Sequence, residues 1–202
     1  MTTCGKLPDA SSDKGVTQVI PDIIGRGTHA GQIQRTIRSA QDFDSTYNLV
    51  GGNDERLPFM PFQLADFTAI LLECVAETNG PNFLDVGAGP GSKMMIAEEL
   101  FGLTPFGVEI DEDLVLCSPY RDNIVCACAL TSDIDYGSYD IIWLYRPFRD
   151  PSMEAQLEGK IREQMKPGAI LAGGAWELDP PLHWETIVDD WDCRRGAFKK
   201  VG

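Results

Sequence analysis

The sequence predicts an α/β fold, in which a doubly wound and mostly parallel sheet carries helices on both faces. From residue 60 onward, short apolar runs alternate with longer segments of helical periodicity, the order that βαβ units produce. The last two predicted strands are separated by only a few residues, too few for a parallel crossover, so they should form an antiparallel hairpin. The 202 residues, 43% hydrophobic and 24% charged, suit one globular domain with a substantial core.

The N-terminal quarter carries weaker signals than the rest. Residues 1–25 are rich in Thr, Ser, Gly, Asp and Pro without periodicity, so we expect a mobile tail. Residues 26–57 form a partly helical extension, in which Ile33 and Ile37 are spaced i, i+4 behind Thr28, the candidate N-cap of a helix over 28–40. The main domain then covers residues 58–202.

Each element of the main domain has its own pattern. The first long helix is predicted within residues 60–80, where apolar side chains share one helical face and Gly80-Pro81 ends the pattern. Gly102 and Pro167-Gly168 end two later helices in the same way. The helices predicted after the first cover residues 92–102, 111–122 and 150–168. The predicted strands are short apolar runs, at residues 82–86, 105–110, 123–130, 139–145, 169–178, 183–193 and 196–201.

The net charge and the cysteine pattern indicate which classes of partner and which cellular compartment suit this acidic protein. A formal net charge of -14 repels phosphate, which disfavours duplex nucleic acid as a partner. The basic segment RRGAFKK, residues 194–200, is explained more simply as a solvated strand. Six cysteines without a CxxC pair, and no signal-peptide pattern, favour a reducing, cytoplasmic setting. No apolar run approaches about 18 residues and no histidine-rich metal spacing occurs, so we expect neither a membrane span nor a metal site.

The segment NFLDVGAGPGSKMM, residues 82–95, contains the strongest functional signal. Its apolar run ends in Asp85, and Gly87, Gly89 and Gly91 follow at alternate positions. Glycine permits positive φ and lets a ligand approach the backbone closely. Ligands of parallel α/β sheets bind beyond the carboxyl ends of the strands. We therefore expect a ligand over this strand-to-helix turn rather than a plain structural turn.

An acid at the end of the next predicted strand indicates a nucleoside. Glu109 lies 24 positions after Asp85, where a carboxylate can accept hydrogen bonds from both hydroxyls of a ribose. The pattern departs from the dinucleotide fingerprint GxGxxG, because Ser92 stands where the third spaced glycine would be. Asp85 also disfavours a pyrophosphate and favours an amino-bearing ligand. An NAD-linked oxidoreductase is therefore the weaker alternative.

The stretches FLDVGAGPGS and FGVEID resemble the first two motifs of the class I S-adenosylmethionine-dependent methyltransferases, and the similarity in motif order covers residues 58–201. The resemblance implies a Rossmann-like, seven-stranded sheet with an antiparallel C-terminal hairpin, and S-adenosyl-L-methionine as cofactor. It further implies that Asp85 lies near the methionine end, that Glu109 binds the ribose and that Ile110 packs on the adenine. The cofactor-binding residues that it implies are Asp85, Gly87, Ala88, Gly89, Gly91, Glu109, Ile110, Ala129 and Leu130.

The acceptor side matches the family less closely. Tyr145-Arg146-Pro147-Phe148 stands where amino-group methyltransferases often read Asn/Asp-Pro-Pro-Tyr/Phe, so it keeps the second proline and the aromatic ring but loses the amide or acid. These four residues are the candidates for the acceptor cleft, although ordinary packing explains Tyr145 and Phe148 equally well. Cys128 stands where the family often has an acid that meets the adenine, and a core role explains it more simply.

The upstream segment PFMPF, residues 58–62, resembles the loop that meets the carboxylate of the cofactor in these enzymes. The methyl acceptor is expected to be a small molecule or a protein, because the acidic charge disfavours duplex nucleic acid. His29 and His183 are expected to be structural or exposed, so no general base is assigned. The altered loop keeps a second hypothesis open, a non-catalytic binding or scaffold protein that retains the nucleoside site.

Overall fold

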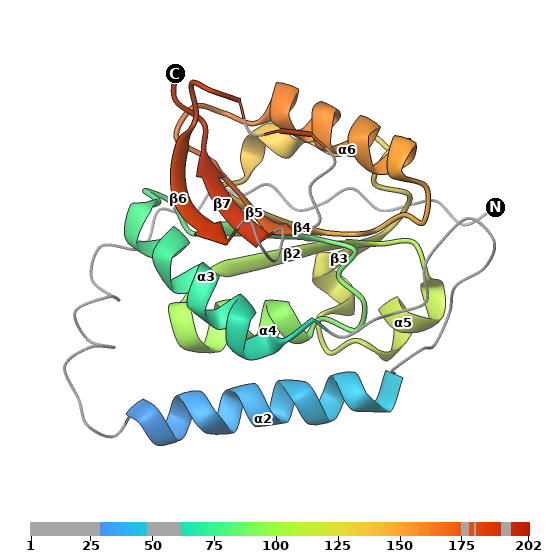
Figure 1. The fold of residues 1–202 in the computed structure, drawn as a ribbon. Helices are drawn as coiled ribbons and strands as arrows, with labels where there is room; N and C mark the ends of the chain where they lie inside the picture. Colours follow the sequence, from blue (N-terminus) through green and yellow to red (C-terminus); the bar gives the residue numbers. More distant parts are fainter. Residues whose placement is uncertain (1–28, 48–61, 175–177, 180, 191–194) are drawn as a thin grey trace.

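One seven-stranded sheet organises the chain, of which the computed structural model describes residues 29–47, 62–174, 178–179, 181–190 and 195–202. The strands are β1 (Asn82–Val86), β2 (Thr104–Glu109), β3 (Ile124–Cys126), β4 (Ile141–Tyr145), β5 (Ile170–Gly174), β6 (Glu185–Asp190) and β7 (Arg195–Lys199). Their order is β3-β2-β1-β4-β5-β7-β6 (Figure 1). β1 to β5 run parallel, whereas β7 pairs antiparallel with β5 and β6. The predicted doubly wound, mostly parallel seven-stranded sheet with an antiparallel C-terminal hairpin is thus confirmed.

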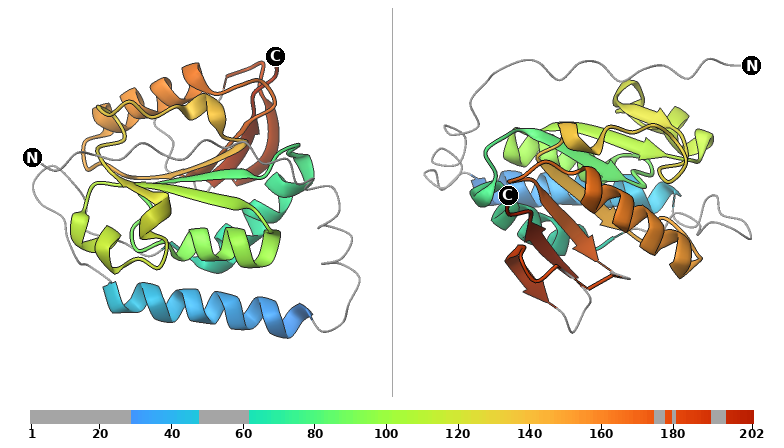
Figure 2. Two further views of the ribbon diagram at one scale, coloured as in Figure 1. Left: turned by 180° about the vertical axis from the view of Figure 1, so that it is seen from behind. Right: turned by 90° about the horizontal axis from the view of Figure 1, so that it is seen from above.

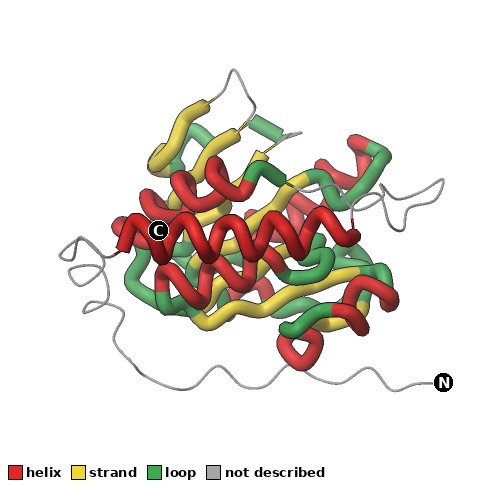
Figure 3. Tube along the Cα trace, turned by 90° about the horizontal axis from the view of Figure 1, so that it is seen from below, coloured by secondary structure: helices red, strands yellow, loops and turns green. Residues whose placement is uncertain are grey.

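Helices cover both faces of this sheet. They are α2 (His29–Tyr47), α3 (Leu64–Glu77), α4 (Ser92–Phe101), α5 (Glu112–Cys117) and α6 (Pro151–Gln164), with 3₁₀ turns η2 (Arg121–Asn123) and η3 (Tyr136–Ser138). α3 and α4 pack on one face and α6 on the other (Figures 1 and 2). α2 packs on the outer side of α4 and, seen from below, runs across the molecule as a further layer (Figure 3).

Alternate residues of the central strands face opposite helical layers. On β4, Ile141 and Trp143 pack toward α3 and α4, whereas Ile142 and Leu144 pack toward α6. The indole of Trp143 is fully buried and meets the ring of Phe67 at a centroid distance of 4.7 Å. Because both faces of a parallel sheet are covered, its strands read as continuous apolar runs, which is why they were predictable from the sequence.

The N-terminal helix α2 extends seven residues beyond the predicted range of 28–40. Its inner face continues through Thr36, Ala40 and Asp44, which are all buried at a spacing of four. Two of these three side chains are polar, so a pattern based on apolar residues ended too early. Thr28, the tail at 1–25 and the expected domain boundary at residue 57 lie outside the described residues.

The third strand is shorter than predicted, since β3 covers three residues of the expected 123–130. The N–H of Ala127 still donates to the carbonyl of Glu109 at 2.8 Å, and then the chain leaves the sheet. The next carbonyls turn toward Lys160 of α6 instead of a neighbouring strand. None of the described helices is both long and apolar enough to cross a membrane.

Candidate functional site

The turn between β1 and α4 has the conformation that its glycines predict. The φ angle is 79° at Gly87, 55° at Gly89 and 94° at Gly91, all in the left-handed region that side chains with a Cβ rarely adopt. Gly91 is also the N-cap of α4. The N–H groups of Gly87 and Ala88 both donate to the carbonyl of Val108, at 2.9 and 3.1 Å, so β2 holds the turn in place.

Glu109 ends β2, and its carboxylate ties the glycine turn to the loop that follows. Oε2 accepts from the N–H of Gly89 at 2.8 Å, while Oε1 accepts from the N–H groups of Ile110 and Asp111 at 2.8 and 2.9 Å. The residue is only 9% exposed. A carboxylate offers about four acceptor positions, so three backbone bonds leave about one for a ligand. Glu109 can therefore accept a hydrogen bond from about one ribose hydroxyl instead of the expected two, unless it releases one of the three backbone N–H groups.

An exposed apolar side chain and a loop held by a lysine flank Glu109. Ile110, which the resemblance assigns to the adenine, is 43% exposed. Nζ of Lys160 donates to the carbonyls of Ala129, Leu130 and Ser132 at 3.4, 3.0 and 2.8 Å. The carbonyls of Ala129 and Leu130 already accept from Lys160, and the N–H of Leu130 bonds to Cys128, which leaves the N–H of Ala129 as the atom through which this pair would recognise a base.

Cys128 is half-buried beside this loop rather than part of the closed core. Burial opposes ionisation of the thiol, but hydrogen bonds from Thr131 and from the N–H of Leu130, together with the charge of Lys160, lower its pKa. Cys128 was expected to be a core residue. It packs against the core on one side, but its thiol also accepts hydrogen bonds from the neighbouring loop. The polar side faces the same loop that the resemblance assigns to the adenine.

Asp85, the acid before the glycines, is closed off by a lysine. It is 0% exposed, and Nζ of Lys93, in the first turn of α4, lies 3.2 Å from its Oδ2. Oδ1 has no hydrogen-bond partner among the described residues. Asp44 of α2 is 2% exposed, and its Oδ1 likewise lacks such a partner. The glycine turn thus lies beside two buried carboxylates and one buried ammonium group.

Burial dominates the electrostatics of this cluster. It raises the pKa of Asp85 to about 6, against the opposing charge of Lys93 and with smaller upward contributions from Glu109 and Asp44. Burial also raises the pKa of Asp44, whereas the nearby Ser92 hydroxyl and the Lys93 ammonium lower it. Two carboxylates that both resist ionisation indicate that one lysine does not compensate their burial fully.

The raised pKa of Asp85 predicts a particular pH dependence of stability. Between about pH 4 and pH 6 the folded protein retains a proton that the unfolded chain has lost, so the contribution of Asp85 to the unfolding free energy falls as the pH rises through this window. Asp85→Asn removes that contribution. As the pH rises from about 4.5 to about 7.5, the unfolding free energy of the variant should increase by about 2 kcal/mol relative to that of the wild type, as measured by denaturant unfolding of both proteins. A difference independent of pH would mean that Asp85 is ionised throughout.

The loop after β4 lies over the glycine turn, as the acceptor hypothesis requires. A Cβ built on Gly87 would lie 3.7 Å from Cβ of Pro147. Arg146 is exposed and has a φ of 45°, the one positive φ outside glycine among the described residues. Such strain is stored most often at functional sites. The structure therefore brings this loop and the glycine turn together at the carboxyl edge of the sheet.

The two aromatic residues of this loop differ in their surroundings. Tyr145 is half-buried, with its ring 4.7 Å from that of Phe62. Phe148 is buried in the core beneath α6, and its N–H donates to Oε1 of Glu154 at 3.2 Å. Of the two readings of Phe148, packing is thus the one its surroundings support, whereas Tyr145 keeps an exposed side.

A cavity of about 320 Å³ opens between the end of α2 and the start of α3. Its lining residues are Gln41, Asp44, Ser45, Phe62, Gln63, Leu64 and Ala65. Phe62 is the described end of the upstream segment 58–62, so this segment does reach the neighbourhood of the buried acids. The other residues of that segment lie outside the described part of the chain.

The basic segment near the C-terminus is used within the fold. Arg195 pairs with Asp66, and Lys199 lies 3.5 Å from Glu77. Lys200 donates to the carbonyls that end α6.

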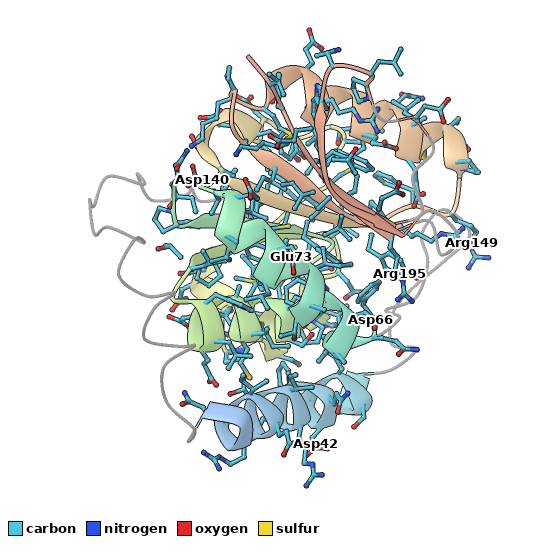
Figure 4. The ribbon with its side chains drawn as sticks, turned by 60° about the vertical axis from the view of Figure 1, so that its left-hand side comes forward. Asp42, Asp66, Glu73, Asp140, Arg149 and Arg195 are labelled. Atoms are coloured by element: carbon cyan, nitrogen blue, oxygen red, sulfur yellow. The ribbon has the colours of Figure 1, made fainter. Side chains whose placement is uncertain are left out.

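Arg149 and Arg195 lie on the side of the molecule opposite Asp140, which precedes β4, so both mark the carboxyl edge of the sheet (Figure 4).

Sequence reasoning did not identify Lys93, Asp44 or Lys160 as site residues. The segment GPGSK, residues 89–93, lacks the spacing of a phosphate loop, so its lysine matches no phosphate-binding motif. A lysine directly behind a buried acid and a glycine turn was nevertheless a usable signal, because a buried carboxylate needs a partner. Asp44 and Lys160 gave no local signal, since their partners lie far away in the chain.

No protein-family model matches this chain, and no curated protein matches it. Solved structures do match. An RNA methyltransferase from Salinibacter ruber, in complex with S-adenosyl-L-homocysteine, is 20% identical with a TM-score of 0.48, covering 70% of this chain and 92% of the other. The N-methyltransferase NodS from Bradyrhizobium japonicum WM9 is 13% identical with a TM-score of 0.49, covering 70% and 98%.

The CcbJ methyltransferase from Streptomyces caelestis is 17% identical to this chain with a TM-score of 0.44. The match covers 62% of this chain and spans 61% of the length of that protein. At these identities the likeness concerns the fold alone. The seven-stranded sheet, with β7 antiparallel to β5 and β6, agrees with the sheet that the motif resemblance implies.

Proposed function

We propose that this chain is an S-adenosyl-L-methionine-dependent methyltransferase that binds its cofactor over the glycine turn and the end of β2. The observation that carries the proposal is Glu109, a buried carboxylate locked against the turn by the N–H of Gly89 and left with about one free acceptor position. A carboxylate in this position at the carboxyl edge of a parallel sheet suits a ribose hydroxyl.

The residues present fit the nucleoside half of this cofactor. Three glycines with positive φ keep the turn free of side chains, and Ile110 offers an uncovered apolar surface beside Glu109. The amino-acid half would lie toward Asp85, which Lys93 closes off. The cofactor supplies an activated methyl group when bound. The part of the chain is to hold the acceptor in line with it and to exclude water.

The acceptor in this proposal is a small molecule or a protein. The net charge of -14 disfavours duplex nucleic acid, and the loop from Tyr145 to Phe148 lies over the glycine turn, where an acceptor would approach. The strained and exposed Arg146 belongs to this loop, which supports a role for it in orienting the acceptor. Tyr145 is a half-buried loop residue whose side chain bears a hydroxyl next to that approach.

Two observations favour a second candidate, a non-catalytic protein that retains the nucleoside site. The loop lacks the amide or acid that would hold an amino acceptor, and Asp85 is sealed by Lys93. Binding and turnover separate the two candidates. Methyl-labelled donor, incubated with pooled small amines and basic proteins, should label an acceptor if the chain is an enzyme, whereas binding without any labelling would favour the second candidate.

Binding of the cofactor should stabilise the folded protein. At about a hundredfold excess over its dissociation constant, S-adenosyl-L-methionine or S-adenosyl-L-homocysteine adds roughly 2.7 kcal/mol, which corresponds to a melting temperature higher by roughly 5–10 °C. Thermal unfolding with each compound, and with NAD in parallel, measures this. Stabilisation by NAD and by neither sulfur nucleoside would contradict the proposal and support the dinucleotide alternative.

A further inference from the structure

The site contains an internal ion pair at the place where the ammonium group of the cofactor would bind. Nζ of Lys93 lies 3.2 Å from Oδ2 of Asp85, and the two residues are 6% and 0% exposed. Both oxygens of Asp85 are buried, and Oδ1 lacks a hydrogen-bond partner among the described residues, whereas Oδ2 is paired with Lys93. A ligand ammonium that binds Asp85 would therefore compete with Lys93 for the carboxylate.

A second acid gives Lys93 another position to occupy. Asp44 of α2 is 2% exposed, with a buried Oδ1 that lacks a hydrogen-bond partner within the described ranges. The charge of Lys93 acts on Asp44 as well as on Asp85. Asp44 also lines the cavity of about 320 Å³ between α2 and α3, so there is space beside it.

When both acids are ionised, the charges of the cluster are not balanced. Asp44 and Asp85 are buried carboxylates, and Lys93 is a buried ammonium group that pairs with Asp85. Buried charges are stable only when they are paired. The cluster therefore has the capacity for one additional cation, and the ammonium of an amino-acid ligand carries that charge.

We propose that Lys93 is a specificity-determining residue, an internal counter-ion that competes with the ammonium of the bound cofactor for Asp85 and moves to Asp44 when that ammonium binds. The inference rests on the proposed function, because it takes the ligand to be a nucleoside with an amino-acid end. It also connects ligand binding to α2. Thr36 of this helix already bonds to Glu99 of α4 at 3.0 Å, and Lys93 on Asp44 would add a second link between the two helices.

Two compounds that differ only at the amino-acid end test the proposal. S-adenosyl-L-homocysteine carries the ammonium, whereas 5′-deoxy-5′-methylthioadenosine keeps the nucleoside and the sulfur without it. Lys93→Met removes the competing charge and keeps the length of the side chain. Calorimetric titration should show the variant binding S-adenosyl-L-homocysteine at least about fivefold more tightly than the wild type does, with affinity for methylthioadenosine changed less than about twofold.

A second variant tests the destination of Lys93. Asp44→Asn leaves the displaced ammonium without a partner, so S-adenosyl-L-homocysteine should bind about fivefold more weakly, with methylthioadenosine unchanged. Matched controls exist for both variants. Lys166 pairs with Asp140 at 2.8 Å at the opposite edge of the sheet, and Asp42 lies on the outer side of α2 (Figure 4), so Lys166→Met and Asp42→Asn should leave both affinities unchanged.

The possible results separate this inference from the proposed function. If the wild type binds neither compound, the proposed function fails and the inference falls with it. If the wild type binds both but Lys93→Met binds S-adenosyl-L-homocysteine equally or more weakly, the function stands, and Lys93 is a structural cation or a ligand of the cofactor carboxylate instead. If Lys93→Met lacks a cooperative thermal transition, Lys93→Gln replaces it, and the Asp44→Asn pair decides independently.

Discussion

Glu109→Ala should weaken binding of S-adenosyl-L-homocysteine by at least about tenfold. The variant loses a charge-assisted hydrogen bond to the ribose, worth about 1.5–3 kcal/mol, where about 1.4 kcal/mol is a factor of ten. It also removes the acceptor that holds the N–H groups of Gly89, Ile110 and Asp111, so the turn and the next loop are no longer tied together. Calorimetric titration measures the affinity directly.

The same substitution should also destabilise the fold, because Glu109 is not the solvated strand end that its sequence position suggests. One buried and two partly buried N–H groups lose their acceptor, and the unfolding free energy should fall by about 2–4 kcal/mol. Glu109→Gln should be intermediate, since its amide retains one acceptor oxygen. Glu112→Ala, at an exposed acid nearby, serves as control. Unchanged affinity in Glu109→Ala would mean that the ribose is held elsewhere.

Gly173→Ala should destabilise the protein by more than about 3 kcal/mol, beyond the usual penalty for overpacking. Gly173 lies in β5 between β4 and β7 and has a φ of 139°. A Cβ at this position would lie 1.9 Å from the carbonyl oxygen of Leu144 in the neighbouring strand. Backbone atoms in the middle of a sheet cannot move aside as a flexible side chain can, so the pairing of β4 with β5 would be disrupted.

A second glycine in the same region provides the comparison. Gly159 lies inside α6, where an added Cβ would meet Cδ1 of Leu178 at an ordinary 3.9 Å. Gly159→Ala should therefore stabilise the protein by up to about 1 kcal/mol through helix propensity. Denaturant unfolding of the two variants side by side measures both effects. A small effect of Gly173→Ala would imply that β5 and β7 adjust to admit the methyl group.

Local requirements made the sheet and the glycine turn predictable from the sequence. Strands covered on both faces must be apolar at nearly every position, as in IIWLY of β4, and the helices between them end at Gly102 or shortly before Pro167-Gly168. The backbone has a positive φ at Gly87, Gly89 and Gly91, and this local requirement for glycine is visible in the sequence without knowledge of the fold. The end of the next strand then follows in register, which is why Glu109 could be identified from its spacing.

The tertiary structure decided which of these groups are free to bind a ligand. Glu109 uses three of its acceptor positions on backbone N–H groups, one of them in a turn 20 residues earlier, and Asp85 is paired with Lys93. Asp44 joins the same cluster from α2, a helix whose inner face is too polar to be recognised by apolar periodicity. Hydrogen bonds and ion pairs between residues distant in the chain leave no periodic trace in the sequence, because they depend on which side chains the packing of α2, α4 and the sheet brings within about 4 Å. The sequence by itself therefore determined the sheet, the turn and the acid at its edge, whereas only the packed structure determined the charge state and the accessibility of the site.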